Sequence, residues 1–175
     1  MKIRATAVLL PLALVACAAP APFDGDMPPF TPSRDGATFR FGQTASIVTK
    51  DVRFHVPVQW EITVDKPTTS RAPRSAADAA SIVCFPVTYT PVAIGEFPRD
   101  VTVAMPELSP IDGSLAANRA DPAYCGNTTV TGYIRDLRVN DTYEGFVASW
   151  AGSADPGIVA TGVELRSHDA TVTWE

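Results

Sequence analysis

Apolar and polar residues alternate with a period of two along much of the chain after residue 36. In VQWEITV, residues 58–64, every second side chain from Val58 through Trp60 to Val64 is apolar. Successive side chains of a β-strand point to opposite faces, so this period predicts a strand with one buried face. The same alternation occurs at Val101, Val103 and Met105, at Phe146, Ala148 and Trp150, and at Ala170, Val172 and Trp174.

Further segments have the composition of strands. They cover residues 37–41, 44–49, 82–94, 128–137 and 158–166. Turn-forming residues separate them at 41–42, 112–113, 125–127, 140–141 and 155–157. Helical periodicity is weak: residues 73–81 and 114–124 could each form one or two helical turns within long connections, and Pro122 would end the second.

These patterns predict an all-β domain of about eight or nine short strands. A sandwich is favoured over a barrel, because one-sided alternation suits two sheets packed face to face with solvent-exposed outer faces. Trp60, Trp150 and Trp174 fall in the apolar sets and are expected in the core.

The first 16 residues have the features of a secretory signal peptide. Lys2 and Arg4 supply the positive charge, and residues 5–14 form an apolar run too short to cross a bilayer. The sequence Leu14-Val15-Ala16-Cys17 then resembles the bacterial lipobox, in which the cysteine receives diacylglycerol and becomes the first residue after cleavage. We expect a lipid on Cys17 and a mature protein on the extracytoplasmic face of the membrane. The alternative is ordinary secretion after cleavage at an Ala-x-Ala site, residues 16–18.

Residues 18–35 are rich in proline, with five prolines between Pro20 and Pro32. Such a segment is stiff and extended. We therefore expect a lipidated cysteine and tether over residues 17–35 and a single domain over residues 36–175. Alternatively, part of the tether packs on the domain through Phe23 or Phe30.

Three cysteines are an odd number for an exported protein. If Cys17 carries lipid, Cys84 and Cys125 remain as a pair that an oxidising compartment would join in a disulfide. The alternative is two buried reduced thiols. A metal site is not expected, since there is no Cys-x-x-Cys and neither His55 nor His168 lies near a cysteine in sequence.

The sequence contains none of the catalytic or cofactor-binding motifs that we sought. There is no nucleophile elbow, no His-Glu-x-x-His and no phosphate-binding glycine loop, so no catalytic residue, cofactor or metal ligand is predicted. The formal net charge is −5 and no basic stripe is present, which argues against nucleic acid as a partner. The preference for arginine over lysine, with many Ala, Pro and Val residues, is typical of a GC-rich genome such as that of an actinobacterium.

Three stretches carry a resemblance to a known family. They are FRFGQTASIV at 39–48, WEITVDKP at 60–67 and VNDTYEGFVAS at 139–149. They resemble a family of immunoglobulin-like β-sandwich domains of secreted and lipid-anchored proteins of Gram-positive bacteria, which includes the mycobacterial immunoprotective extracellular antigen. The region between Cys84 and Cys125 departs from the family pattern. The resemblance implies a fold and an extracellular setting, and it brings no catalytic residues.

These observations support three hypotheses about function. The first is a non-enzymatic, membrane-anchored binding module of the cell envelope, with an unknown envelope protein or ligand as its partner. Its binding surface would be the excursion between Cys84 and Cys125, because a disulfide can hold an irregular loop in one shape. The second is a carrier of a small apolar ligand or lipid in a pocket of several hundred Å³. The third is a hydrolase that gathers His55 or His168 with acidic residues on folding.

Overall fold

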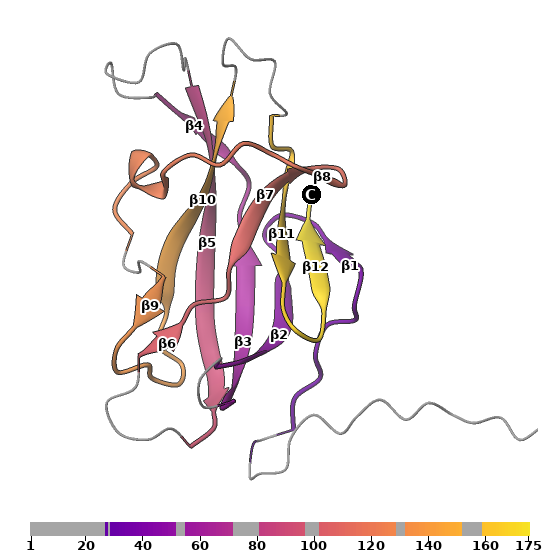
Figure 1. Cartoon of the computed structure of the whole chain (residues 1–175), viewed down its shortest axis with the longest axis vertical. Helices are drawn as coiled ribbons and strands as arrows, with labels where there is room; N and C mark the ends of the chain where they lie inside the picture. The colour runs from indigo at the N-terminus through magenta and orange to yellow at the C-terminus, as the bar shows by residue number, and fades with distance from the viewer. Residues whose placement is uncertain are drawn as a thin grey trace, which may run out of the picture.

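The computed structural model describes residues 27, 29–51, 55–71, 81–96, 102–128, 132–151 and 159–175. The predicted signal peptide, Cys17, most of the predicted tether and almost all of the expected helical turns at 73–81 lie outside these residues. The described part contains twelve strands and one short 3₁₀ helix, η1 (Pro122–Tyr124). Figure 1 shows how the strands are arranged. The prediction of an all-β sandwich is confirmed.

The first sheet has five strands. Their order is β1 (Ala37–Phe39), β12 (Thr171–Trp174), β11 (Gly162–Arg166), β7 (Leu108–Asp112) and β8 (Leu115–Ala116). β1 pairs with β12 in parallel, and the other neighbours are antiparallel.

The second sheet is built around the longest strand, β5. Its order is β10 (Tyr143–Ala151), β5 (Ser81–Ile94), β3 (Pro57–Val64) and β2 (Thr44–Lys50). The short strand β4 (Thr68–Ser70) pairs with β5 beyond the end of β3. A separate two-stranded sheet pairs β6 (Val103–Ala104) with β9 (Tyr133–Ile134), beside β10 in Figure 1.

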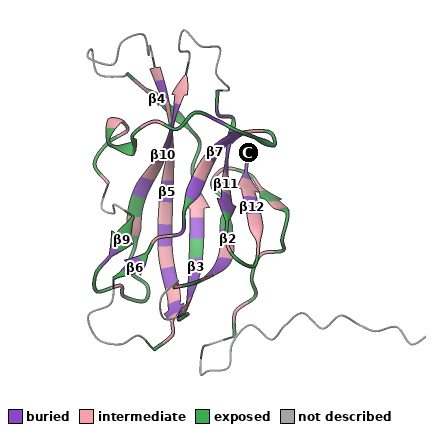
Figure 2. Ribbon diagram, in the orientation of Figure 1, coloured by how far each residue is buried: buried purple, intermediate pink, exposed green. Residues whose placement is uncertain are grey.

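The main core lies between the two five-stranded sheets. Trp60 and Phe85 come from the second sheet, Val163 and Trp174 come from the first, and all four are fully buried. Buried positions recur along β5 in Figure 2, where they are purple. The indole Nε1 of Trp174 donates to the Gln43 carbonyl at 2.9 Å, so the tryptophan satisfies its polar group within the apolar layer. The expectation that Trp60 and Trp174 are core residues is confirmed.

Two prolines occur inside β5, a central strand in which proline is ordinarily unfavourable. Pro86 lies opposite the gap between β3 and β4, where only its carbonyl is required, and that carbonyl accepts from the Asp65 amide at 2.9 Å. Pro91 lies at the register shift between β3 and β5 that occurs beside Trp60. Each proline therefore falls where the pairing of β5 with β3 and β4 is interrupted, so β5 can contain both prolines without losing a hydrogen bond there.

Several strand boundaries differ from the prediction. The segment 128–137 contributes only β9 among its described residues, and β7 and β8 were not predicted. β7 has the sequence LSPID, in which a proline and two polar residues conceal the strand pattern. In residues 114–124 the predicted helical turns are reduced to η1, and β8 begins the segment.

The domain begins slightly before residue 36. The Ser33 amide donates to the Ser46 carbonyl at 2.7 Å, and the Ser33 hydroxyl accepts from the Ser46 amide at 2.9 Å. The Asp35 carboxylate accepts from the Thr171 amide at 2.8 Å. The last residues assigned to the tether are thus bound to β2 and β12 and belong to the sandwich.

Candidate functional site

Cys84 and Cys125 are joined in a disulfide, with their Cα atoms 5.6 Å apart. This agrees with the pairing that the sequence predicted. Cys84 lies in β5 and Cys125 follows η1, so the bond ties a loop to the middle of the second sheet. The thiol groups are consequently not available as ligands or nucleophiles.

The disulfide belongs to a second apolar cluster on the outer face of the second sheet. Ile82, Cys84 and Ala148 form its buried part, and Tyr124 and Trp150 pack against them with their ring centroids 5.9 Å apart. We call residues 117–125, which include Tyr124 and Cys125, the covering segment. Around Ile82, Cys84 and Ala148 the outer face of β5 and β10 is therefore buried, contrary to the prediction of one-sided alternation.

The alternation in β10 was recognised, but its inward face was assigned wrongly. Phe146 and Trp150 face the outer cluster, while Val147 belongs to the main core. Ser149 is also buried, and its hydroxyl donates to the Asn118 carbonyl at 2.8 Å. The prediction failed because the covering segment supplies the outer face with a second apolar environment, which allows large side chains there and small ones inside.

The covering segment adds a short ladder to the outer edge of β10. The Trp150 amide donates to the Asn118 carbonyl at 3.1 Å, and the Ala120 amide donates to the Ala148 carbonyl at 2.9 Å. The ladder ends at Asp121, because Pro122 has no amide hydrogen and the chain turns into η1. The Asp121 side chain caps that turn by accepting from the Ala123 amide at 2.9 Å.

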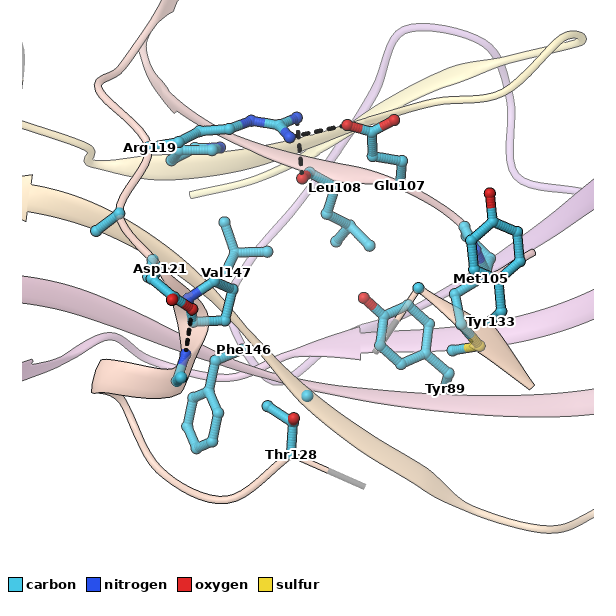
Figure 3. Close-up of a pocket in the computed structure, with 18 of the residues that line it drawn as sticks. Tyr89, Met105, Glu107, Leu108, Arg119, Asp121, Thr128, Tyr133, Phe146 and Val147 are labelled. Carbon is cyan, nitrogen blue, oxygen red and sulfur yellow. Dashed lines mark hydrogen bonds and ion pairs between the residues drawn. The ribbon is translucent and has the colours of Figure 1, made fainter. Parts of the chain in front are cut away.

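A pocket of about 610 Å³ opens where this ladder stops, and we call it the edge pocket. Its walls come from β10 and β5, from residues 104–108 and 110, from residues 119–123 of the covering segment, and from Thr128, Gly132 and Tyr133 (Figure 3). The volume lies in the range of small-molecule sites. The pocket meets the main core, since Tyr89, Leu108 and Val147 belong to both.

Gly145 gives the edge pocket much of its room. A Cβ atom at this position would lie 3.7 Å from Cε2 of Tyr89, so a longer side chain would extend beside that ring. Because Gly145 has no side chain, one side of the Tyr89 ring faces the pocket.

Tyr89 supplies a polar group inside this largely apolar site. The residue is only 9% exposed, and its hydroxyl points into the pocket in Figure 3. Burial raises the pKa of Tyr89 above its ordinary value, so the hydroxyl keeps its proton and can donate. We find no hydrogen bond to this hydroxyl within the described part of the chain.

The charged residues of the edge pocket lie at its rim. Arg119 pairs with Glu107 at 2.8 Å and also donates to the Ser109 hydroxyl and, at 3.4 Å, to the Leu108 carbonyl. Asp121 is occupied as the cap of η1. Arg119 is thus paired with Glu107. The rim carries one positive charge, on Arg119, and two negative charges, on Glu107 and Asp121.

The two histidines lie away from the edge pocket. His168 contacts Asp169 at 2.8 Å in the exposed hairpin between β11 and β12. His55 is exposed in a turn, with a positive φ of 55°. Neither histidine lines the pocket, and no group of three or more metal-ligating side chains occurs among the described residues.

Sequence reasoning did not find Tyr89, Gly145 or Arg119. Tyr89 and Gly145 fall inside strand patterns, and only the pairing of β10 with β5 in antiparallel register brings them together. Arg119 lies in the excursion that the sequence favoured as a binding surface. Its position between Cys84 and Cys125 was the signal in the sequence that pointed to it.

Comparisons with known proteins bear on the fold. No protein-family model and no curated protein matches the chain. A search of solved structures finds MPT63, a secreted protein from Mycobacterium tuberculosis, with 16% sequence identity and a TM-score of 0.50. The match covers 79% of this chain and 95% of MPT63. The sandwich therefore resembles that of the mycobacterial antigen family indicated by the sequence motifs. Within the described residues, no helix is both long and apolar enough to cross a membrane.

Proposed function

We propose that the protein is a non-enzymatic binding module on the extracytoplasmic face of the membrane, anchored by lipid on Cys17, and that the edge pocket is its binding site. The observation that carries the proposal is the edge pocket itself, which opens beside the main core and is lined by the hydroxyl-bearing side chain of Tyr89. Pockets with apolar walls and a few polar groups are typical of ligand sites.

The signal peptide and lipobox support the anchored location. A two-chain lipid anchor is stable because each buried CH₂ contributes about 0.8 kcal/mol. The fold that is shared with a secreted mycobacterial protein is compatible with this location. The hydrolase hypothesis gains no support from His55 or His168, which are both exposed and do not line the pocket.

The anchor is tested by substituting Cys17→Ala in the full-length chain. Membranes are separated from medium and soluble fractions, and cells are fed an alkyne fatty acid to label lipoproteins. We expect the wild-type chain in the membrane fraction with label and the variant outside it without label. Unchanged membrane association of the variant contradicts the anchor.

The binding site is tested separately by asking what co-purifies with the chain. Organic extracts of the wild-type chain and of Gly145→Leu are compared by mass spectrometry. We expect a compound that the wild type carries and that the variant loses, because the leucine occupies the space beside Tyr89. Gly145→Ala, whose Cβ makes an ordinary contact, is the matched control and should retain the compound. Equal recovery from all three chains contradicts the edge pocket as the site.

A further inference from the structure

The chemistry of the edge pocket identifies a class of ligand, on the condition that the pocket is the binding site as proposed above. Its inner wall is apolar: Leu108 and Val147 belong to the main core, and Met105 packs against it. Phe146 and Thr128 lie on the opposite side from Arg119 and Glu107 in Figure 3. A ligand that fills this space needs an apolar body.

The Tyr89 hydroxyl adds a second requirement. Tyr89 as a whole is nine-tenths buried in the apolar wall. Its hydroxyl faces the pocket and has no partner in the described part of the chain. The hydroxyl atom itself is open to the pocket, so a ligand that displaces solvent from it must offer an acceptor or leave this donor unsatisfied. Because a protonated phenol donates, the complementary group on the ligand is an acceptor.

The rim charges decide between a neutral and an anionic acceptor. An anion that enters an apolar pocket loses its hydration and requires a cation to compensate. Arg119 is the cation that lines the pocket, and Glu107 already neutralises it at 2.8 Å. Asp121 adds a further negative charge on the same rim. A carboxylate, sulfate or phosphate would therefore meet a rim on which two negative charges outnumber one positive charge.

From these observations we infer that the edge pocket binds an uncharged amphipathic small molecule, with an apolar body against Leu108 and Val147 and a carbonyl or ether oxygen that accepts a hydrogen bond from Tyr89. The rim, with its polar groups, would face any polar substituent at the outer end of the ligand. Gly145 sets the size limit, because any side chain larger than a methyl group would compete with the ligand for the space beside Tyr89.

The test uses a matched pair of photoreactive probes on the full-length chain isolated from its bacterial host. Benzophenone is neutral and carries a ketone acceptor, while 4-benzoylbenzoate has the same photoreactive ketone and a negative charge. Under ultraviolet light both insert into C–H bonds near the ketone. Peptide mass spectrometry then locates the adducts, and labelling against probe concentration gives the half-saturation value.

We expect benzophenone to label peptides that contain Met105, Leu108 or Val147, and 4-benzoylbenzoate to label them at least about tenfold less, because its charge must be desolvated. Tyr89→Phe should raise the benzophenone half-saturation value about 2- to 12-fold, as expected for the loss of one hydrogen bond. Tyr133→Phe is the matched control: Tyr133 also lines the pocket but is 68% exposed, and its removal should change little.

Gly145→Leu and Gly145→Ala distinguish a failure of the proposed binding site from a failure of the proposed ligand class. Thermal unfolding shows whether each variant is folded. If pocket labelling is blocked by Gly145→Leu but is insensitive to Tyr89→Phe, or is as strong with 4-benzoylbenzoate, the ligand class is wrong and the site stands. If benzophenone labels elsewhere, or labels the folded Gly145→Leu chain equally, the site itself is wrong. A bound peptide along β10 in place of a small molecule would also overturn the inference.

Discussion

The two apolar clusters on either face of the second sheet are built in different ways. The main core lies between two hydrogen-bonded sheets, and Trp60, Phe85 and Trp174 are completely buried in it. The outer cluster is covered by a single irregular segment, which is held by one disulfide, a two-bond ladder and a one-turn helix. The first arrangement is maintained by the fold as a whole, whereas the second depends on a few identifiable bonds.

This difference matters because the edge pocket lies where the two clusters meet. Its inner wall is supplied by the main core through Tyr89 and Val147, and its outer wall by the covering segment. The fold can therefore keep one wall fixed while the position of the other depends on the Cys84–Cys125 bond. Substitutions in the two clusters should consequently affect stability and pocket shape to different extents.

The largest loss of stability should come from Trp60→Ala. Trp60 is fully buried, and its Nε1 donates to the Thr49 hydroxyl at 2.8 Å. We expect a loss of about 3–5 kcal/mol in the free energy of unfolding, measured by urea denaturation. Trp150→Ala, in the partly exposed outer cluster, should cost distinctly less. Equal losses for the two variants would remove the distinction between the clusters.

The next largest effect should follow from removing the disulfide by the double substitution Cys84→Ala and Cys125→Ala. The sequence separation of 41 residues corresponds to a stabilisation of about 4 kcal/mol in the chain-entropy model. Hydrogen exchange should increase most in residues 117–125, while β2 and β3 remain the best protected strands.

Two measurements on the wild-type chain complete this prediction. Thiol alkylation without reductant should label neither Cys84 nor Cys125, and alkylation after reduction should label both. Free labelling of the native chain at both positions contradicts the bond. A uniform rise in hydrogen exchange over both sheets of the double variant would show that the main core also depends on it.

The sequence-based predictions were also more accurate for the main core than for the outer cluster. Where strands pack between two sheets, as at Trp60 in β3 and Trp174 in β12, the period of two correctly identified the strands and their buried faces. Along β10 the period was present, but both faces are apolar, so periodicity alone cannot show which one faces the main core. The covering segment supplies the missing information, and its path is not encoded in any local pattern.

The candidate site was harder to predict than the fold. The disulfide followed from the number of cysteines and the expected compartment. By contrast, Tyr89 and Gly145 are ordinary strand residues until the register places them beside one another, 56 positions apart in sequence. This part of the pocket leaves no motif in the sequence, because Tyr89 and Gly145 each fit the local pattern of a strand.

The smallest effect on stability should come from removing the Asp121 cap of η1. This cap lies in the covering segment, which forms the outer wall of the edge pocket. Asp121→Ala removes the acceptor for the Ala123 amide, which should cost about 0.5–1 kcal/mol in the free energy of unfolding. Asp121→Asn retains an acceptor and serves as the control. Because Asp121, Pro122 and Ala123 all line the edge pocket, Asp121→Ala should also weaken benzophenone labelling of the pocket more than its small stability loss would suggest. Unchanged labelling would mean that the disulfide and the ladder to β10 position the covering segment without the cap.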